Sequence, residues 1–451
     1  MRPHDLVIKG RLVLPEGIKP GWLTVDAGLI SAIGNGEAPG AKSVHDFGDN
    51  YVLAGFVDGQ THATSYRGLP GMAETTLSAL AGGITTIVDM PYDNPDPLNN
   101  LERLEAKIAA VNSVSHCDVA LYATIAPGQS PAVLYPLAKA GVCAFKISSF
   151  ESHPVRFPRL PHGEIIEILE ASTDTGLPVG LHNEDQEIVR TNIARLRSEG
   201  RVTPEWHEPS RPVSAELVST VSFLEMGAAT GAHVHLVHIS TPRGYELVER
   251  YKAEGVHATA ELCVHYLHFD ADRDIGHLGA LMKVNPPIRG SVLDGLWRTF
   301  EAGKLQFVSS DHSSWPVNNK QTPAIFDAGA GIPGLETLAP SFFTDLKARV
   351  EEPVLALTDY LSDRPARFFG LDDRKGRLAL GLDADIAILE EGSFLFDASR
   401  TRDGLNWSPY DGETFAARIS ATYLRGSKVW NGRTVLSSAR GRFLPRGRKV
   451  R

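Results

Sequence analysis

The spacing of apolar residues changes character twice along the chain, near residue 52 and again near residue 376. Before residue 52, short apolar runs are separated by Gly, Pro and Asp, and none is long enough to show the 3.6-residue period of a helix. This pattern predicts a small all-β unit. Its expected strands are Leu6–Ile8, Arg11–Leu14, Trp22–Val25 and Leu29–Ile33.

Between residues 52 and 375, short apolar runs alternate with longer stretches that carry apolar residues at helical spacing. Eight repeats of this kind are typical of a closed (β/α)8 TIM barrel of the α/β class. The expected strands are Leu53–Val57, Ile84–Met90, Asp118–Ile125, Val142–Ile147, Pro178–His182, Val234–Ile239, Val256–Leu262 and Gln306–Asp311. Helices are expected at Leu101–Val111, Glu164–Thr175, Ala215–Thr230 and Val292–Ala302.

Strand patterns return after residue 376, at Ala384–Leu389, Ala417–Leu424 and Lys428–Trp430. We expect residues 376–451, which end in a C-terminal tail, to join residues 1–51 in one composite β-sandwich, with the barrel of residues 52–375 inserted between them. Two long irregular stretches, Ser148–Leu160 and Ser313–Gly334, are expected to be lids or substrate loops, since long loops in compact domains are usually functional.

Polar residues gather at the carboxyl ends of the predicted barrel strands, the face on which barrel active sites lie. They are Gln60 and His62 on the first strand, Lys146 on the fourth, His182 on the fifth, His238 on the sixth and Asp311 on the eighth. Taken singly, each has an ordinary structural interpretation, such as a hydrogen-bonded His, a lysine that snorkels or an aspartate that caps a loop. Taken together in this order, they favour a metal site.

The sixth strand carries three histidines, of which one is expected at the site. Alternation along a strand puts His233 and His235 on one face and His238 on the other. We predict that Val234, Leu236 and His238 face the barrel interior, and that His233 and His235 are structural residues facing the helices.

Composition narrows the function classes. The formal charge of −9 and pI near 6.0 argue against nucleic acid as the main ligand. Three cysteines do not make a disulfide framework and indicate a reducing, cytoplasmic location. The N-terminus is too short in apolar length for a signal sequence, and no run of about 18 apolar residues predicts a membrane span. The basic segment after Arg440 is expected to be a solvated end.

Several segments resemble the cyclic amidohydrolases, namely hydantoinase, dihydropyrimidinase, allantoinase and dihydroorotase. The resemblance covers almost the whole chain and is closest in motifs to allantoinase. It rests on Ala81–Pro91, His235–Thr241, Glu261–Leu267, Asn285–Arg289, Ser310–Ser313, Lys375–Asp385 and Trp407–Gly412.

The resemblance implies a metal-dependent hydrolase of a cyclic amide C–N bond in a small ureide, hydantoin, dihydropyrimidine or imide. His62, Asp311 and Gln60 would hold a first divalent ion, and His182 and His238 a second. Lys146, carbamylated by CO2, would bridge them. A metal-bound hydroxide would attack the carbonyl, with Asp311 as general base and then acid. Zinc is expected, with manganese as the alternative and one or two ions per chain. Asn285 would contact substrate, and relatives imply a homotetramer.

Three departures from the family pattern affect this expectation. Gln60 stands where an imidazole is expected, and an amide oxygen is a weaker zinc ligand, which predicts a weakened first site or a harder ion. Thr64 replaces the arginine of dihydroorotases, so that activity is not expected. Glu151 stands where hydantoinases place a tyrosine that stabilises the oxyanion, so we expect His153 or the metal in that role.

Gln60 also leaves two alternatives open. The first is a metal-poor pseudoenzyme that serves as an interaction scaffold. The second is a mononuclear enzyme with altered chemistry, although Lys146 argues against a deaminase. Retention of Lys146, His182, His238 and Asp311 favours a working hydrolase.

Overall fold

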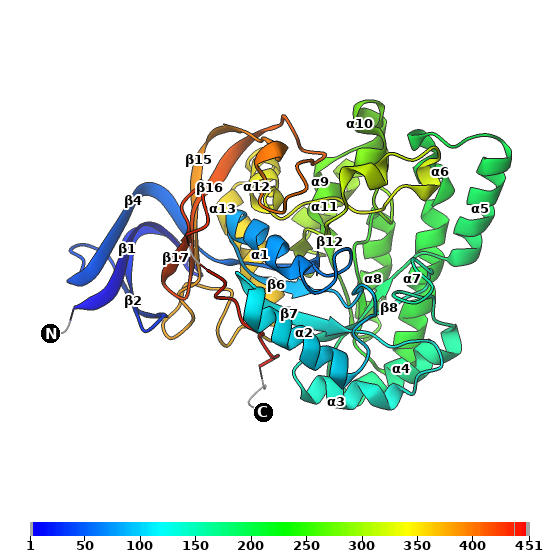
Figure 1. Cartoon of the computed structure of the whole chain (residues 1–451), viewed down its shortest axis with the longest axis horizontal. Helices are drawn as coiled ribbons and strands as arrows, with labels where there is room; N and C mark the ends of the chain where they lie inside the picture. The colour runs from blue at the N-terminus through cyan, green and yellow to red at the C-terminus, as the bar shows by residue number, and fades with distance from the viewer. Residues whose placement is uncertain (1–2, 437, 448–451) are drawn as a thin grey trace.

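The computed structural model describes residues 3–436 and 438–447 and consists of a β-sheet domain beside a helix-ringed barrel (Figure 1). Strands from both ends of the chain build the sheet domain, shown in blue for the N-terminal strands and in orange to red for the C-terminal ones. No helix among the described residues is long and apolar enough to cross a membrane. Cys117, Cys143 and Cys263 are buried and unpaired.

The sheet domain is composite, as expected. Its seven strands are hydrogen-bonded in the order β17-β16-β15-β4-β1-β2-β3, so that β4 and β15 join the two ends of the chain in antiparallel register. Apolar side chains of β1, β2, β4, β15 and β16 form a core separate from that of the barrel. The strands are β1 His4–Leu14, β2 Gly17–Asp26, β3 Leu29–Gly34, β4 Ala41–Ala54, β15 Ile386–Leu395, β16 Thr414–Leu424 and β17 Ser427–Trp430.

The barrel is closed and entirely parallel, which confirms the TIM-barrel prediction. Its strands are β5 Phe56–His62, β6 Ile84–Asp89, β7 Asp118–Ala123, β8 Ala144–Ser148, β9 Val179–His182, β10 Val234–Leu236, β11 Ala258–Ala260 with β12 Leu262–Cys263, and β13 Val308–Ser309 with β14 His312–Ser313. The first strand starts later than predicted, because Leu53 and Ala54 belong to β4 of the sheet domain.

Helices surround the barrel and connect its strands. They are α1 Gly71–Ala81, α2 Leu101–Val114, α3 Leu134–Lys139, α4 His162–Thr175, α5 Gln186–Ser198, α6 His207–Ser210, α7 Val213–Thr230, α8 Pro242–Ala253, α9 Val264–His268, α10 Ala271–Leu278, α11 Leu293–Glu301, α12 Leu338–Lys347, α13 Pro353–Thr358 and α14 Arg364–Phe368. Side-chain caps mark several starts: Asn100, Asp185 and Thr241 each accept a hydrogen bond from the first turn of the helix that follows.

The prediction of which side chains of the sixth strand face the barrel interior is wrong. Val234 packs against Gly227 of α7 and so faces the helices. His235 stacks on Phe307 and contacts the tilted ring of Phe368, and both phenylalanines belong to the apolar cluster inside the barrel. The reason is that β10 ends at Leu236 and His238 adopts a positive φ of 40°. Alternation therefore stops before His238, and a turn rather than the pleat brings its ring to the mouth of the barrel.

The C-terminal segment is also not a free solvated end. Gly441 donates its N–H to Ser115 O, and Leu444 donates to Val119 O at the start of β7. The Leu444 side chain is buried in the apolar cluster inside the barrel. Residues 441–447 therefore cover the amino-terminal end of the barrel, while residues 448–451 of the predicted tail lie outside the described residues.

Candidate metal-binding active site

A cavity of about 430 Å³ lies at the carboxyl ends of the barrel strands. Its volume is within the range of roughly 300–1,000 Å³ that is usual for small-molecule sites. The structure brings all eight predicted site residues to the wall of this cavity: Gln60, His62, Lys146, His153, His182, His238, Asn285 and Asp311. Residues separated by up to 251 positions in sequence thus meet at one place.

The first and last strands bring Gln60, His62 and Asp311 together. Gln60 Nε2 donates to Asp311 Oδ1 at 2.8 Å, and His62 Nε2 lies 3.5 Å from the same oxygen. Buried Asp58 fixes the two strands against each other, since its carboxylate accepts from the Ser310 N–H and from the Ser310 hydroxyl. Asp311 has a positive φ of 49°, so the chain turns sharply there and breaks the eighth strand into β13 and β14.

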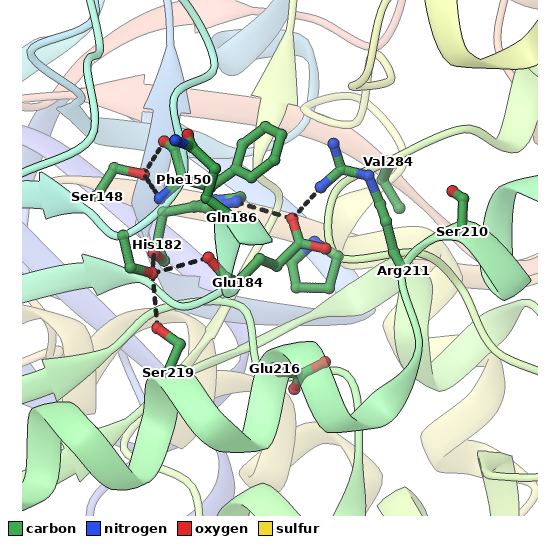
Figure 2. Close-up of polar contacts among 12 residues, drawn as sticks. Ser148, Phe150, His182, Glu184, Gln186, Ser210, Arg211, Glu216, Ser219 and Val284 are labelled. Carbon is green, nitrogen blue, oxygen red and sulfur yellow. Dashed lines mark hydrogen bonds and ion pairs between the residues drawn. The ribbon is translucent and has the colours of Figure 1, made fainter. Parts of the chain in front are cut away.

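The imidazoles of His182 and His238 face each other, with His182 Nδ1 3.0 Å from His238 Nε2. Behind them, His182 Nε2 donates to Glu184 Oε2 at 2.9 Å, and Arg211 is ion-paired with the same carboxylate (Figure 2). Burial alone would raise the pKa of Glu184, but Arg211 and His182 lower it to about 2. The ionised carboxylate therefore holds the His182 N–H and leaves its Nδ1 lone pair directed at the cavity.

Lys146 projects from β8 into the barrel and is buried. Burial lowers its pKa to about 8, although Glu261 and Asp311 partly oppose this effect. No hydrogen bond to its ammonium group is formed within residues 3–436 and 438–447. A neutral amine is accessible to this side chain near neutral pH, as carbamylation requires.

The protonation states of Asp311 and His238 also suit metal ligation. Burial would raise the pKa of Asp311, but its contact with His62 and the nearby His265 and Lys146 bring it below the usual value, so the group is a carboxylate at neutral pH. Burial also holds the pKa of His238 well below its usual range, which leaves a neutral ring. A carboxylate and a neutral imidazole are the protonation states in which these groups bind metals.

An unpartnered buried atom tests whether these residues fit a metal. Gln60 Oε1 is buried and finds no hydrogen-bond partner in the described part of the chain. An orphaned acceptor of this kind is uncommon in folded proteins and fits a site that completes itself with a cation. Oxygen and imidazole nitrogen in one site suit zinc or manganese. The donor set of the cavity therefore fits a divalent ion.

A second acidic cluster is not a rival site. Within residues 3–436 and 438–447, the only set of three His, Cys or carboxylate ligand atoms lying within 4.8 Å of one another is Asp118, Asp383 and Asp385. The ammonium group of Lys375 already occupies its centre, 2.5 to 2.9 Å from each carboxylate. The candidate ligands of the cavity are more widely spread than these three carboxylates.

Two loops complete the cavity wall. In the predicted loop after β8, Glu151 turns away and forms an ion pair with Arg190, whereas His153 and Arg156 line the cavity. His153 Nδ1 accepts from the Arg156 N–H at 3.1 Å, which leaves the other ring nitrogen as a donor. In the loop of residues 313–334, the carbonyls of Ile325 and Ala328 accept from buried Lys283, which anchors the loop.

Sequence reasoning missed several residues of this site. Glu184, Arg211, Tyr92, Arg156 and Lys283 were not predicted to belong to it. Glu184 lies two residues beyond the end of β9, so strand alternation gave no signal for it. The others come from loops or a helix start, where no periodicity reports direction.

Comparison with known proteins identifies the family. The sequence model of the amidohydrolase family matches residues 51–429. The chain belongs to the amidohydrolase family. It is 33% identical over 448 residues to an allantoinase of Rubrobacter xylanophilus and 29% identical over 453 residues to an L-hydantoinase of Paenarthrobacter aurescens, covering 98% of each chain in both cases. The solved L-hydantoinase (dihydropyrimidinase) of Arthrobacter aurescens superimposes with a TM-score of 0.93 at 29% identity, over 98% of this chain and 100% of that one.

Proposed function

We propose that this amidohydrolase is a metal-dependent hydrolase that opens the C–N bond of a cyclic amide. The observation that carries the proposal is the cavity in which the amine of Lys146, the facing rings of His182 and His238, and the carboxylate of Asp311 converge. Its relatives are named allantoinase and hydantoinase, which supports a ureide or hydantoin ring as substrate. Dihydropyrimidines and cyclic imides are the further candidates.

The metal site in this proposal has two parts. His62, Asp311 and Gln60 would hold one divalent ion, and His182 and His238 the other, with Lys146 between them as a carbamate. Carbamylation joins the neutral amine to CO2 and releases one proton, so the depressed pKa of Lys146 supports it. A bound divalent ion supplies Lewis acidity, which activates water and polarises the amide carbonyl. Zinc is the proposed metal, with manganese as the alternative that the Gln60 oxygen favours.

Asp311 moves the proton in this mechanism. It is ionised and lies beside His62 and Gln60 at the centre of the ligand set. Its carboxylate accepts the proton of the attacking water and delivers it to the ring nitrogen as the C–N bond breaks. The Gln60 N–H steadies Oδ1 of that carboxylate, which leaves Oδ2 to carry the proton.

Asn285 and His153 are the proposed substrate contacts. Asn285 Oδ1 is buried and finds no hydrogen-bond partner in the described structure, so it offers an acceptor for a ring N–H. Burial and nearby Arg156 lower the pKa of His153, whose free ring nitrogen then donates as a neutral imidazole to the developing oxyanion. A homotetramer in the cytoplasm is the assembly and location that we propose from the resemblance.

Two experiments test the proposal. Purified protein incubated with Zn2+ or Mn2+ and bicarbonate is expected to contain at least one divalent ion per chain and to open at least one ring in a screen of allantoin, hydantoins, dihydrouracil and cyclic imides. The relatives give no support to the alternative of a metal-poor scaffold protein. A metal-loaded protein that opens none of these rings would overturn the proposed activity.

A further inference from the structure

The guanidinium of Arg156 on the cavity wall has no ionic partner among the described residues. Four cationic side chains line the cavity, Lys146, Arg156, Arg211 and Lys283, against the single carboxylate of Asp311. Arg211 is ion-paired with Glu184 behind the wall. Three carbonyl groups accept hydrogen bonds from Lys283. Arg156, by contrast, forms no ion pair with any carboxylate in the residues that the structure describes.

The surrounding groups hold Arg156 in place. Its side chain donates to Ser65 O in the loop after β5. Its guanidinium lies over the ring of Tyr92, with Cζ 4.8 Å from the ring centroid. Its backbone N–H is bound by His153. A guanidinium has five N–H donors, so one carbonyl and one aromatic face leave most of them free.

Tyr92 adds a second donor at the same edge of the cavity. Burial raises its pKa to about 12, so the phenol keeps its proton. The ring packs against Phe157 at 5.2 Å and against His62 at 6.0 Å between centroids. Tyr92 therefore contacts both Arg156 and the predicted metal ligand His62.

We propose that Arg156 is a specificity residue that binds a carboxylate carried on the substrate ring, so that the preferred substrates are cyclic amides with an anionic side group. The inference rests on the proposed function and narrows its substrate class. A planar fork of N–H donors matches a carboxylate in two parallel hydrogen bonds, and a partly buried, uncompensated cation gains more from such a partner than an exposed one does.

The test compares two substrates of equal shape, hydantoin-5-acetate and hydantoin-5-acetamide, which differ only in charge. Wild-type enzyme is expected to open the carboxylate with a kcat/KM about tenfold or more above that of the carboxamide. Arg156→Gln is expected to reduce this ratio to near one, and Arg156→Lys to an intermediate value, since Lys keeps the charge but not the fork. The ratio within each variant cancels any general loss of active protein.

Arg159→Gln is the matched control. Arg159 lies on the same loop and pairs with Glu187 rather than lining the cavity, so the wild-type ratio is expected to remain. Equal efficiency on both compounds in the wild type, or an unchanged ratio in Arg156→Gln, overturns the anion site while leaving the hydrolase proposal intact. If the wild type opens neither ring, calorimetry measures the Kd of each compound for wild type and for Arg156→Gln. Equal Kd values for the two compounds in the wild type, or an unchanged Kd ratio in Arg156→Gln, overturn the anion site.

Discussion

The amide nitrogen of Gln60 donates a 2.8 Å hydrogen bond to Oδ1 of Asp311, across the seam where the first and last barrel strands meet. An imidazole at position 60 would offer a ring nitrogen lone pair at this place, whereas the amide offers a proton to the carboxylate and keeps its oxygen unpartnered. For the proposed metal site, this relationship predicts that the first position is the weaker one and the His182–His238 pair the stronger one.

Gln60→His is expected to raise the metal content of the purified protein, by up to about one ion per chain, because imidazole is a better zinc ligand than an amide oxygen. Elemental analysis of protein prepared without added metal measures the number of ions per chain. Gln129→His serves as a control, since the Gln129 amide donates to Asn99 O and does not line the cavity. An unchanged stoichiometry in Gln60→His would remove residue 60 from the metal site.

Asp311→Asn is expected to lower kcat by roughly 10³-fold or more, because the amide can neither accept the proton of water nor return it to the leaving nitrogen. Steady-state hydrolysis of whichever ring the wild type opens provides the measurement, with metal content determined in parallel. Asp174→Asn, at an exposed carboxylate that accepts from the Tyr135 hydroxyl and does not line the cavity, is expected to keep full activity. Comparable turnover by Asp311→Asn at equal metal content would assign the proton transfer to another group.

Much of the fold could be predicted from the sequence, because strands and helices that bury one face carry apolar residues at a regular spacing. The strand of Lys146 is an example. On β8, Ala144 belongs to the apolar cluster inside the barrel and Phe145 to the core outside it, and the same alternation brings Lys146 to the cavity. The same rule failed for His235, because β10 ends two residues before His238 and the pleat cannot be extended across a turn. Arg156 and Tyr92 lie on loops, whose side-chain directions depend on contacts between distant segments and carry no local signal.

Glu184→Gln is expected to weaken metal binding by about 10- to 100-fold, because the carboxylate that orients His182 loses its charge. It is also expected to reduce the free energy of unfolding by roughly 3 kcal/mol, since buried Arg211 loses its ionic partner. Metal competition with a chelating dye and urea unfolding measure the two effects. Glu187→Gln, on an exposed carboxylate that pairs with Arg159, is the control and is expected to change neither.

Carbamylation of Lys146 is expected to depend on pH through the amine. Because burial places its pKa at about 8, the fraction of neutral amine rises between pH 6 and pH 9. Metal-free protein held at one fixed concentration of dissolved labelled CO2 at every pH is therefore expected to show a carbamate carbon signal by NMR, with a formation rate that is half-maximal near pH 8. Lys146→Met is expected to lack the signal. A signal that persists in this variant would place the carbamate on another lysine.

His268 connects the barrel to the sheet domain and predicts a loss of stability in alkali. Its Nδ1 contacts Asp345 on α12 at 2.8 Å, and its Nε2 contacts Glu413 beside β16 at 2.7 Å. Burial disfavours the charged ring, but the two carboxylates outweigh it and raise the pKa to about 9. Since the pKa is higher in the folded state than in the unfolded chain, the stabilisation is complete below about pH 6.5 and disappears as pH rises through 9.

The free energy of unfolding in urea is therefore expected to fall by roughly 1–3 kcal/mol more in wild type than in His268→Gln between pH 6 and pH 9.5. The neutral amide cannot gain or lose the charge, so the variant is less stable than wild type at pH 6 and nearly equal to it at pH 9.5. His162→Gln, at an exposed ring at the start of α4, is expected to follow the wild-type curve. Parallel pH profiles for wild type and His268→Gln would mean that the pKa of His268 is the same in the folded and the unfolded protein.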